Sequence, residues 1–475
     1  VIVAGAIFTL PALYILGLEA QFYQVFLASL FGGLLGILML IPFRKYFVKD
    51  MHGKYPFPEA TATTEVLVSG EKKGNQAKLL AISGLVGGLY DFCVSTFGWW
   101  TENISTRLIG WGDMVAEKMK VVFKVNTGAA VLGLGYIIGL KYSAIICAGS
   151  FTVWFVLIPF LSYFGDGQTL AVGEGITTLI RDMSPEMIFT HYARHIGIGG
   201  IAMAGIIGIV RSSGIIRQAL GLAVNELKGK KTAEENVERT QRDLTMKFIM
   251  IGILATLVTT FIFFQFGVLG NWLQTVVAIL IVFVISFLFT TVAANAIAIV
   301  GTNPVSGMTL MTLILASLVL VSAGLSGTGG MMAAMVIGGV VCTALSMAGG
   351  FITDLKIGYW LGTTPAKQET WKFLGTAVSA ATVAGVMIIL NETYGFVGEG
   401  SLVAPQANAM AAVIKPLMEG GATPWMLYFA GAALALILTM IGVPALAFAL
   451  GMFIPLELNT PLLIGGLVSW FVSTR

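Results

Sequence analysis

Long apolar runs separated by short polar stretches fill this chain, and they predict a series of membrane-spanning helices. Residues 248–353 contain no Asp, Glu, Lys or Arg. A helix needs about 20 apolar residues to cross a bilayer core, so this region has room for about four or five crossings. The same reading of the whole chain predicts about thirteen or fourteen hydrophobic segments. They are residues 1–18, 22–42, 79–98, 126–140, 144–164, 191–210, 248–268, 273–300, 308–322, 331–350, 373–390, 425–441, 443–454 and 462–472.

A break interrupts the most apolar region at residues 301–307. The pattern on either side predicts one helix over residues 273–300 and another over residues 308–322. Between them, Pro304 lacks an amide hydrogen and disfavours helical backbone at Asn303, while a glycine stands at each end. The chain is therefore expected to leave the helical conformation here.

Such a break is a candidate substrate site. It frees amide and carbonyl groups, which are tolerated at membrane depth only when they are buried in protein or line a wet cavity. Many transporters hold their substrates at broken helices. Asn303, Pro304 and Ser306 are therefore candidate substrate-binding residues. The alternative is a tight turn between two spans at the membrane surface, because Asn-Pro is also an ordinary turn signal.

The distribution of basic residues predicts which loops face the cytoplasm. Residues 43–78 carry seven basic residues against four acidic ones, which marks a cytoplasmic loop. Counting the spans from there places the charged loop 211–247 on the same side and the segment 391–424 outside the cell. An acidic loop at residues 165–190 is also placed outside. The loop 102–124 falls outside too, although it carries four basic residues.

The composition supports the same class of protein. Hydrophobic residues make up 57% and charged residues 11% of the chain, with a mean hydropathy of +0.89, whereas soluble domains carry about 25% charged residues. We therefore expect an all-α, polytopic membrane protein with a single transmembrane domain over residues 1–475. Glycine pairs such as Gly32 and Gly36 would let its helices approach closely. The basic residues cluster at span ends rather than on one face, so no nucleic-acid partner is expected.

The cysteines and the start of the chain add two expectations. Cys93, Cys147 and Cys342 lie in apolar segments at unrelated spacings, so neither a disulfide framework nor a zinc site is expected. The chain begins inside a hydrophobic span without Met, and we interpret it as a fragment of a longer protein.

A second break precedes two acidic residues. The sequence after Pro56 and Pro58 is compatible with a helix of about ten residues, which is too short to cross the membrane. It predicts a re-entrant half-helix within the cytoplasmic stretch 43–78. Glu59 and Glu65 lie roughly two turns apart on this helix, and we expect them to handle protons or substrate. The alternative is a surface helix with solvated acids.

Three further ionisable residues lie within predicted spans. Asp91 lies deep in the span 79–98, where an ionisable group is costly and is a functional candidate by default. The alternative is a structural acid paired with a neighbouring helix. His195 is a candidate proton relay, and Arg194 is a candidate partner of a substrate carboxylate. The alternative for both is that their side chains reach the outer interface.

The sequence signatures of enzymes are missing. The chain has no His-Glu-x-x-His metal motif and no aspartate-rich pair for binding pyrophosphate through magnesium. The glycine-rich residues 326–330 lack the lysine of a phosphate loop. With three histidines in the chain, a metal site of the usual kind is not expected. We therefore expect no enzymatic activity, no cofactor and no bound metal.

Several motifs together resemble one family of transporters. The motifs are Ile7-Phe8-Thr9-Leu10-Pro11-Ala12-Leu13, Pro56-Phe57-Pro58-Glu59-Ala60-Thr61-Ala62, Gly301-Thr302-Asn303-Pro304-Val305-Ser306-Gly307-Met308-Thr309, Asp354-Leu355-Lys356-Ile357-Gly358-Tyr359, Pro405-Gln406-Ala407-Asn408 and Pro455-Leu456-Glu457-Leu458-Asn459-Thr460-Pro461. They occur in family order and run nearly from end to end. On these motifs the chain is identified as a member of the oligopeptide transporter (OPT) family, in its bacterial, yellow-stripe-like branch. The expected fold is the OPT-type transporter fold, with broken and re-entrant helices and without the ends that longer members have.

The resemblance implies secondary active uptake, driven by protons, across the cytoplasmic membrane of a bacterium. The substrates would be short peptides or metal chelates of peptide-like or amino-acid-like ligands. The peptide-transporting eukaryotic branch carries a Lys-Ile-Pro-Pro-Arg signature near residues 362–367, where this chain differs. Both substrate classes therefore stay open, and so does assembly into a homo-oligomer. The alternatives are a passive channel, for which no pore-loop repeat is evident, and a membrane-embedded enzyme.

Overall fold

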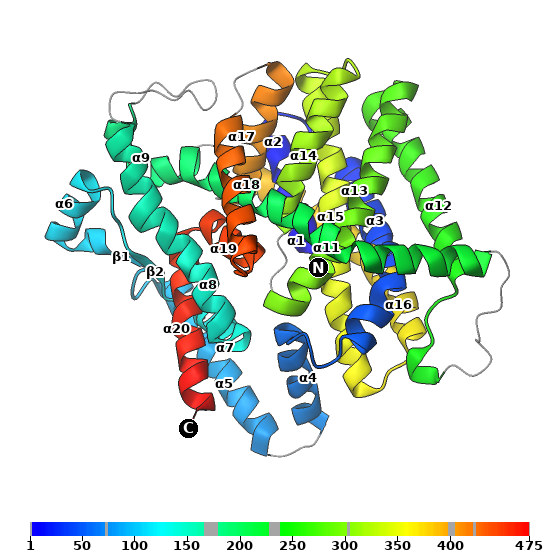
Figure 1. The fold of residues 1–475 in the computed structure, drawn as a ribbon, viewed down its shortest axis with the longest axis horizontal. Helices are drawn as coiled ribbons and strands as arrows, with labels where there is room; N and C mark the ends of the chain where they lie inside the picture. Colours follow the sequence, from blue (N-terminus) through cyan, green and yellow to red (C-terminus); the bar gives the residue numbers. More distant parts are fainter. Residues whose placement is uncertain are drawn as a thin grey trace. The chain divides into compact units, whose positions relative to one another are not determined.

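The protein is described by a computed structural model that is almost entirely helical (Figure 1). The structure describes residues 2–71, 75–165, 179–227, 238–301, 305–397, 404–420 and 424–474. Its internal contacts divide the chain into two compact units. Unit 1 comprises Val1–Phe57 and Gly205–Thr423, and unit 2 comprises Pro58–Ala204 and Pro424–Arg475. The helix α11 (Arg194–Leu227) contributes residues to both units.

Unit 1 is built around the helix α15 (Gly327–Leu361). This helix is apolar on every side, and 94% of its most apolar stretch is buried, as expected of a helix that other helices surround. Its main neighbours are α3 (Phe22–Leu40), α13 (Trp272–Val300), α14 (Val305–Ser322) and α1 (Ile2–Thr9).

Glycines set the distance between α3 and α15. A Cβ added at Gly32 would lie 2.3 Å from the carbonyl oxygen of Val340, and one added at Gly36 would lie 2.3 Å from that of Ala344. No larger residue fits at either position without moving the two backbones apart. The predicted glycine pair therefore lies in a helix–helix contact, as small residues do in membrane proteins.

The other elements of unit 1 surround this core. They are α2 (Pro11–Ile15), η1 (Ile41–Phe43), η2 (Lys45–Asp50), η9 (Arg239–Gln241), α12 (Met246–Phe264), η10 (Gln265–Leu269), α16 (Pro365–Thr393) and α17 (Pro405–Glu419).

Unit 2 is organised around α20 (Leu456–Ser473), which packs on α7 (Ala129–Ile138) and α8 (Leu140–Phe151). A Cβ at Gly451 would lie 1.8 Å from the carbonyl oxygen of Ile146, so glycine is again needed where helices meet. The other elements are α4 (Pro58–Glu71), α5 (Asn75–Phe92), η3 (Cys93–Phe97), β1 (Asn103–Ser105), η4 (Thr106–Leu108), α6 (Gly110–Lys118), β2 (Lys124–Asn126), η5 (Thr152–Leu157), α9 (Ile158–Phe164), η6 (Ile180–Asp182), α10 (Pro185–Ile188), η7 (Phe189–Ala193), α18 (Trp425–Met440) and α19 (Ala445–Phe453). The two short strands pair antiparallel, with Ile104 opposite Val125.

Seven helical stretches among the described residues are long and apolar enough to cross a membrane. They are Phe22–Phe43, Leu140–Phe164, Arg239–Leu269, Trp272–Ile299, Gly327–Leu361, Pro365–Thr393 and Leu456–Ser473. Each overlaps a segment predicted from the sequence, so the prediction of an all-α, polytopic protein is confirmed. Other predicted spans are shorter helices: α7 has 10 residues and α19 has 9. Their lengths, about 15 Å or less, do not reach across a bilayer core.

Some local expectations differ from the structure. The sequence pattern starts the last apolar segment at residue 462, directly after Pro461, but α20 begins at Leu456 and runs through this proline. Pro461 removes one main-chain hydrogen bond near the start of the helix, and the packing of α20 on α7 and α8 outweighs that loss. The charged segment 211–247 begins with the last turns of α11, and the segment 391–424 contains α17.

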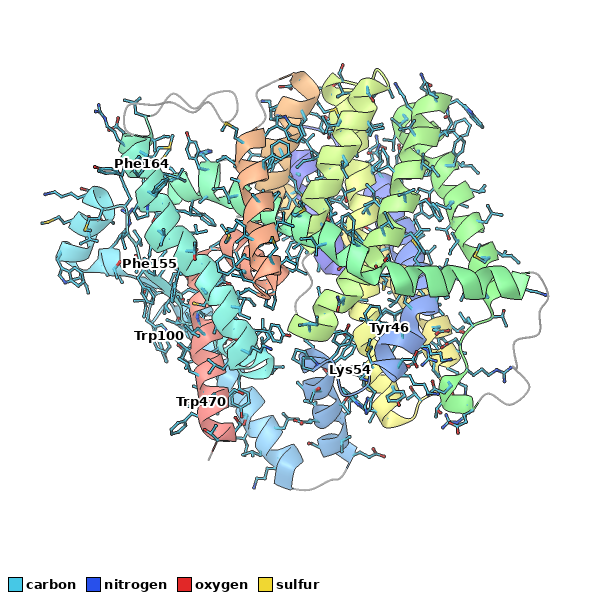
Figure 2. The ribbon with its side chains drawn as sticks, in the orientation of Figure 1. Tyr46, Lys54, Trp100, Phe155, Phe164 and Trp470 are labelled. Atoms are coloured by element: carbon cyan, nitrogen blue, oxygen red, sulfur yellow. The ribbon has the colours of Figure 1, made fainter. Side chains whose placement is uncertain are left out.

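Aromatic side chains project from the surface of unit 2. Trp470 lies near the end of α20, and Trp100 follows η3; both are exposed (Figure 2). Exposed tryptophans at the ends of apolar helices are typical of the membrane–water interface.

Candidate functional site

The break that the sequence predicts after α13 lies between two described helices. α13 ends at Val300, and Gly301 follows in the left-handed conformation with φ 77°. The amide of Gly301 donates to the carbonyl of Ile297 at 3.0 Å, and α14 begins at Val305. The predicted residues Asn303 and Pro304 lie outside the described residues. Ser306 is in the first turn of α14, and its side chain is not described either.

The second break lies against the end of α13. The amide of Phe57 donates to the carbonyl of Ala298 at 2.9 Å. Carbonyl groups in the last turn of a helix have no helical partner, so this bond satisfies one of them. Phe57 has a positive φ of 43°, which is uncommon for a residue other than glycine. The segment before α4 and the last turn of α13 therefore meet within unit 1.

A buried lysine lies beside this contact. Lys356, near the end of α15, is 1% exposed. Its ammonium donates to the carbonyl of Val48 at 2.7 Å and lies 3.0 Å from Nδ1 of His52. The centroids of three aromatic rings lie 5.1 to 5.2 Å from the same nitrogen, those of Phe57, Tyr359 and Trp360. Among the described residues, no carboxylate forms an ion pair with Lys356, and a carbonyl, an imidazole and three aromatic rings surround its ammonium instead.

The sequence interpretation missed Lys356 as a site residue. The residue follows Asp354 and falls at the start of a stretch that reads as a cytoplasmic loop. In the structure α15 continues to Leu361, so Lys356 belongs to a buried helix. A single basic residue within one helical turn of an apolar run was the signal that could have identified it.

Glu59 and Glu65 lie on α4, as predicted, but in different surroundings. α4 has 14 residues and begins at Pro58, so Glu59 is in its first turn and is partly buried. Glu65 is exposed and lines an open pocket of about 810 Å³ in unit 2. The other lining residues come from α4, α5 and α7: Ala62, Thr64, Val66, Val68, Ser69, Leu79, Leu80, Ser83 and Ile137. The pocket thus has one carboxylate among mostly apolar and hydroxyl groups.

Asp91 makes a contact at the start of a neighbouring helix. Its Oδ1 accepts a hydrogen bond from the amide of Ala129, the first residue of α7, at 2.9 Å. The first amides of a helix lack helical acceptors and carry partial positive charge, so a carboxylate stabilises this end. The contact supports the structural alternative for Asp91.

Arg194 and His195 are buried inside unit 2, at 6% and 9% exposure. The guanidinium of Arg194 lies 4.5 Å from the ring centroid of Phe453. The imidazole of His195 meets the ring of Tyr428 edge-on, with 5.6 Å between the centroids. Both side chains therefore pack against α18 and α19 rather than extending into solvent.

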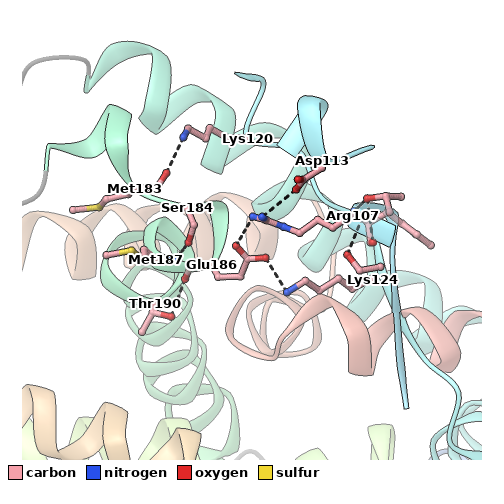
Figure 3. A network of polar contacts seen from close by, with 12 residues as sticks. Arg107, Asp113, Lys120, Lys124, Met183, Ser184, Glu186, Met187 and Thr190 are labelled. Carbon is pink, nitrogen blue, oxygen red and sulfur yellow. Dashed lines mark hydrogen bonds and ion pairs between the residues drawn. The ribbon is translucent and has the colours of Figure 1, made fainter. Parts of the chain in front are cut away.

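An ion-pair network joins two loops that the sequence predicts to lie outside the cell (Figure 3). Glu186 pairs with Arg107 at 3.0 Å and with Lys124 at 2.9 Å, and Arg107 also approaches Asp113 at 3.5 Å. Burial alone would raise the pKa of Glu186, but its hydrogen bond to Lys124 and the charges of Lys124 and Arg107 outweigh burial and lower it. Two of the basic residues in the loop 102–124 thus pair with one acid of the loop that follows.

The C-terminal motif also has a structural contact that sequence reasoning missed. Asn459 is fully buried, and its side-chain amide donates to Oγ of Ser150 at 2.6 Å and to the carbonyls of Gly451 and Ile454 at 3.1 and 3.2 Å. These carbonyls lie where the chain leaves α19. Asn459 therefore satisfies backbone groups that a helix break exposes.

No site of the described residues is suited to a metal ion. Among them, no group of three or more His, Cys, Asp or Glu side chains could hold one. The polar groups described above are suited to binding and positioning charged or hydrogen-bonding molecules.

Comparisons with known proteins give the family. A family model for the OPT oligopeptide transporter protein matches residues 1–475. A curated protein of Haemophilus influenzae named "Putative oligopeptide transporter" is 26% identical over 515 residues, covering 99% of this chain and 78% of that protein. Both findings agree with the family that the sequence motifs indicated. They identify an integral membrane transporter rather than an enzyme. The chain belongs to the OPT oligopeptide transporter family.

Proposed function

We propose that this transporter takes up short peptides, or metal chelates of peptide-like ligands, together with protons across the cytoplasmic membrane of a bacterium. One arrangement in unit 1 carries the proposal: the amide of Phe57 bonds to the broken end of α13 at Ala298, and the ammonium of Lys356 lies over the Phe57 ring. Interrupted helices beside a buried charge that no described carboxylate pairs with are suited to holding a polar molecule in an apolar protein.

The groups at this place complement the two ends of a peptide. The amides at the start of α14 and the ammonium of Lys356 would attract a carboxylate. The carbonyls at the end of α13 would accept hydrogen bonds from an ammonium group. Asn303 and Pro304 come between these helices in the sequence, and Ser306 belongs to the first turn of α14. All three remain our candidates for direct substrate contact.

Five ionisable residues remain candidates for carrying protons or contacting substrate: Glu59, Glu65, Asp91, Arg194 and His195. The position of Glu65 in the wall of a pocket favours contact with a solute. His195 lies inside unit 2 and remains our candidate for a proton relay within the protein. The capping contact of Asp91 with Ala129 makes it the weakest of these candidates.

A passive channel is the alternative, and counterflow separates the two mechanisms. Vesicles containing the purified protein are loaded with unlabelled peptide or chelate and diluted into labelled substrate. A carrier exchanges the two and accumulates label transiently above equilibrium, whereas a channel only equilibrates it. Absence of the transient accumulation would favour the channel.

Uptake into vesicles also decides the substrate class and the coupling ion. Labelled peptides of three to five residues and labelled iron chelates are compared, each with and without an inwardly directed proton gradient. We expect one class to accumulate faster when the gradient is present and to lose this advantage when a protonophore is added. Equal uptake with and without the gradient would contradict proton coupling.

A further inference from the structure

A buried cluster of charged groups lies in unit 1, apart from the helix breaks. Arg44, directly after η1, is 1% exposed, and its Nε forms an ion pair with Oδ1 of Asp243. Its Nη2 also donates to the carbonyl of Gln241 at 3.3 Å. Glu369 of α16 is fully buried, and its Oε2 accepts from the amide of Leu244 at 2.8 Å. The cluster thus contains one guanidinium and two carboxyl groups.

The second carboxyl group lies next to this ion pair. Leu244, whose amide donates to Glu369, directly follows Asp243 in the chain. Among the described residues, no hydrogen-bond donor reaches the buried Oε1 of Glu369. An ionised carboxylate can only accept hydrogen bonds, so an ionised Glu369 would leave a charged oxygen buried without a partner. The burial of Glu369 therefore favours a protonated carboxylic acid beside the ion pair of Asp243 and Arg44.

Counting charges leads to the same result. With one proton bound, the cluster holds one positive and one negative charge and is neutral. Without it, a second negative charge would be buried at Glu369, beside the ion pair of Asp243 and Arg44. The cost of an unpaired buried charge opposes that state.

No further cation among the described residues neutralises the second carboxyl. The guanidinium of Arg239 donates to Oγ1 of Thr364 at 2.9 Å and to the carbonyl of Gly362 at 3.0 Å. Lys372, on the same helix as Glu369, is paired with Asp354. The side chains of Arg242 and Lys247 are exposed. The charges that act on Glu369 are those of Asp243 and Arg44.

We propose that Asp243 and Glu369 together bind one proton, and that this is the proton carried with the substrate. The second part rests on the proposed proton-coupled uptake. The bound proton forms the O–H bond of one carboxylic acid, and its release leaves two carboxylates beside Arg44. Release would weaken the contact between the segment before α12 and the start of α16, because two like charges would then face each other.

Infrared spectroscopy of the full chain in lipid vesicles tests the proton directly. The absorption of a protonated carboxyl group, recognised by its shift in heavy water, is followed as pH is varied. We expect the wild type to show one such group in the neutral range, and both Glu369→Gln and Asp243→Asn to lose it. Each substitution keeps the shape of the side chain, and Glu419→Gln, on the exposed end of α17, is the matched control. Persistence of the absorption in both variants would overturn the proton site.

Transport by the same vesicles tests the coupling. The ratio of uptake with a proton gradient to uptake without it is expected to fall to unity in Glu369→Gln and to stay at the wild-type value in Glu419→Gln. An unchanged ratio in Glu369→Gln would overturn the role in coupling. If the wild type itself does not respond to a gradient, the proposed proton-coupled uptake fails, and the infrared titration still decides whether Asp243 and Glu369 bind a proton.

Discussion

Lys356 carries a charge that unit 1 solvates with its own groups. A carbonyl, an imidazole and three aromatic rings surround its ammonium. Hydrogen bonds to charged groups contribute about 1.5–3 kcal/mol each, and a desolvated cation–π contact contributes about 2 kcal/mol. These contacts stabilise the buried ammonium, with which no carboxylate among the described residues pairs.

We expect Lys356→Met to lower substrate uptake roughly tenfold or more, because losing one charged hydrogen bond to a substrate carboxylate costs more than about 1.4 kcal/mol. Uptake into vesicles at several substrate concentrations is the measurement. Lys54→Met is the matched control, since Lys54 is exposed on the same segment as His52 (Figure 2). Wild-type uptake by Lys356→Met would remove this residue from the substrate site.

Two substitutions of Asp91 can separate a structural role of its side chain from a role in proton handling. Asp91→Ala removes the acceptor for the amide of Ala129 and should destabilise the protein by about 0.5–2 kcal/mol, as lost helix caps do. Asp91→Asn keeps an acceptor oxygen and should retain most of the unfolding temperature. Thermal unfolding of the purified variants, followed by tryptophan fluorescence, tests both expectations. Loss of gradient-driven uptake in a stable Asp91→Asn variant would instead support a role in proton handling.

Among the elements, the strands β1 and β2 are joined to the segment around α10 by ion pairs. Glu186 bonds both Arg107, which follows β1, and Lys124, the first residue of β2. The lowered pKa of Glu186 means that its ionised form is stabilised more in the folded protein than in the unfolded chain. This contribution is therefore complete above the unfolded pKa of about 4.3 and is lost as pH falls through the lower folded value.

We expect Glu186→Gln to lower the unfolding temperature at neutral pH and to have little effect in acid. The difference should be small, below about 1 kcal/mol, because Glu186 is partly exposed and water screens its ion pairs. Unfolding temperatures of both proteins, measured across the acid and neutral range, should converge as pH falls. Glu117→Gln, an exposed position of α6, serves as the control. A difference that stays constant or widens in acid would contradict this assignment.

The positions of helices and breaks could be predicted from the sequence because local residues determine them. Gly301 ends α13 through its left-handed backbone, and Pro58 begins α4. The contact between Phe57 and Ala298 could not be predicted, since it joins segments far apart in the chain. The same holds for Glu369, which appears in the sequence as one acid just before the predicted span 373–390. Only the packing of α16 beside residues 241–244 places it next to Arg44 and Asp243.

At the scale of the whole molecule, the apolar composition predicts many helices but not which of them is central. α15 and α16 have almost the same mean hydropathy over their most apolar stretches, 2.0 and 2.1, yet 94% of that stretch is buried in α15 and 28% in α16. Glycine contacts explain the difference, because Gly32 and Gly36 of α3 let the backbone of α15 approach. The hydropathy index measures how favourably a side chain moves from water into an apolar medium. It therefore does not distinguish a helix that is buried in protein from one that faces lipid.

The burial of α15 predicts the order in which the helices of unit 1 unfold locally. Amide hydrogens exchange through local unfolding, which is rarest where a helix is packed on all sides. We therefore expect α15 to exchange more slowly than α12 and α16, each of which is 28% buried over its most apolar stretch. Deuterium uptake by the detergent-solubilised protein, followed by mass spectrometry of its peptides, measures the exchange rate of each helix.

Gly36→Ala should raise the exchange rate in α15, because the added Cβ would push against the carbonyl of Ala344. Gly88→Ala, which meets no neighbour within 4 Å, should leave it unchanged. Equal exchange in α12, α15 and α16 would mean that α15 is not the central helix of unit 1.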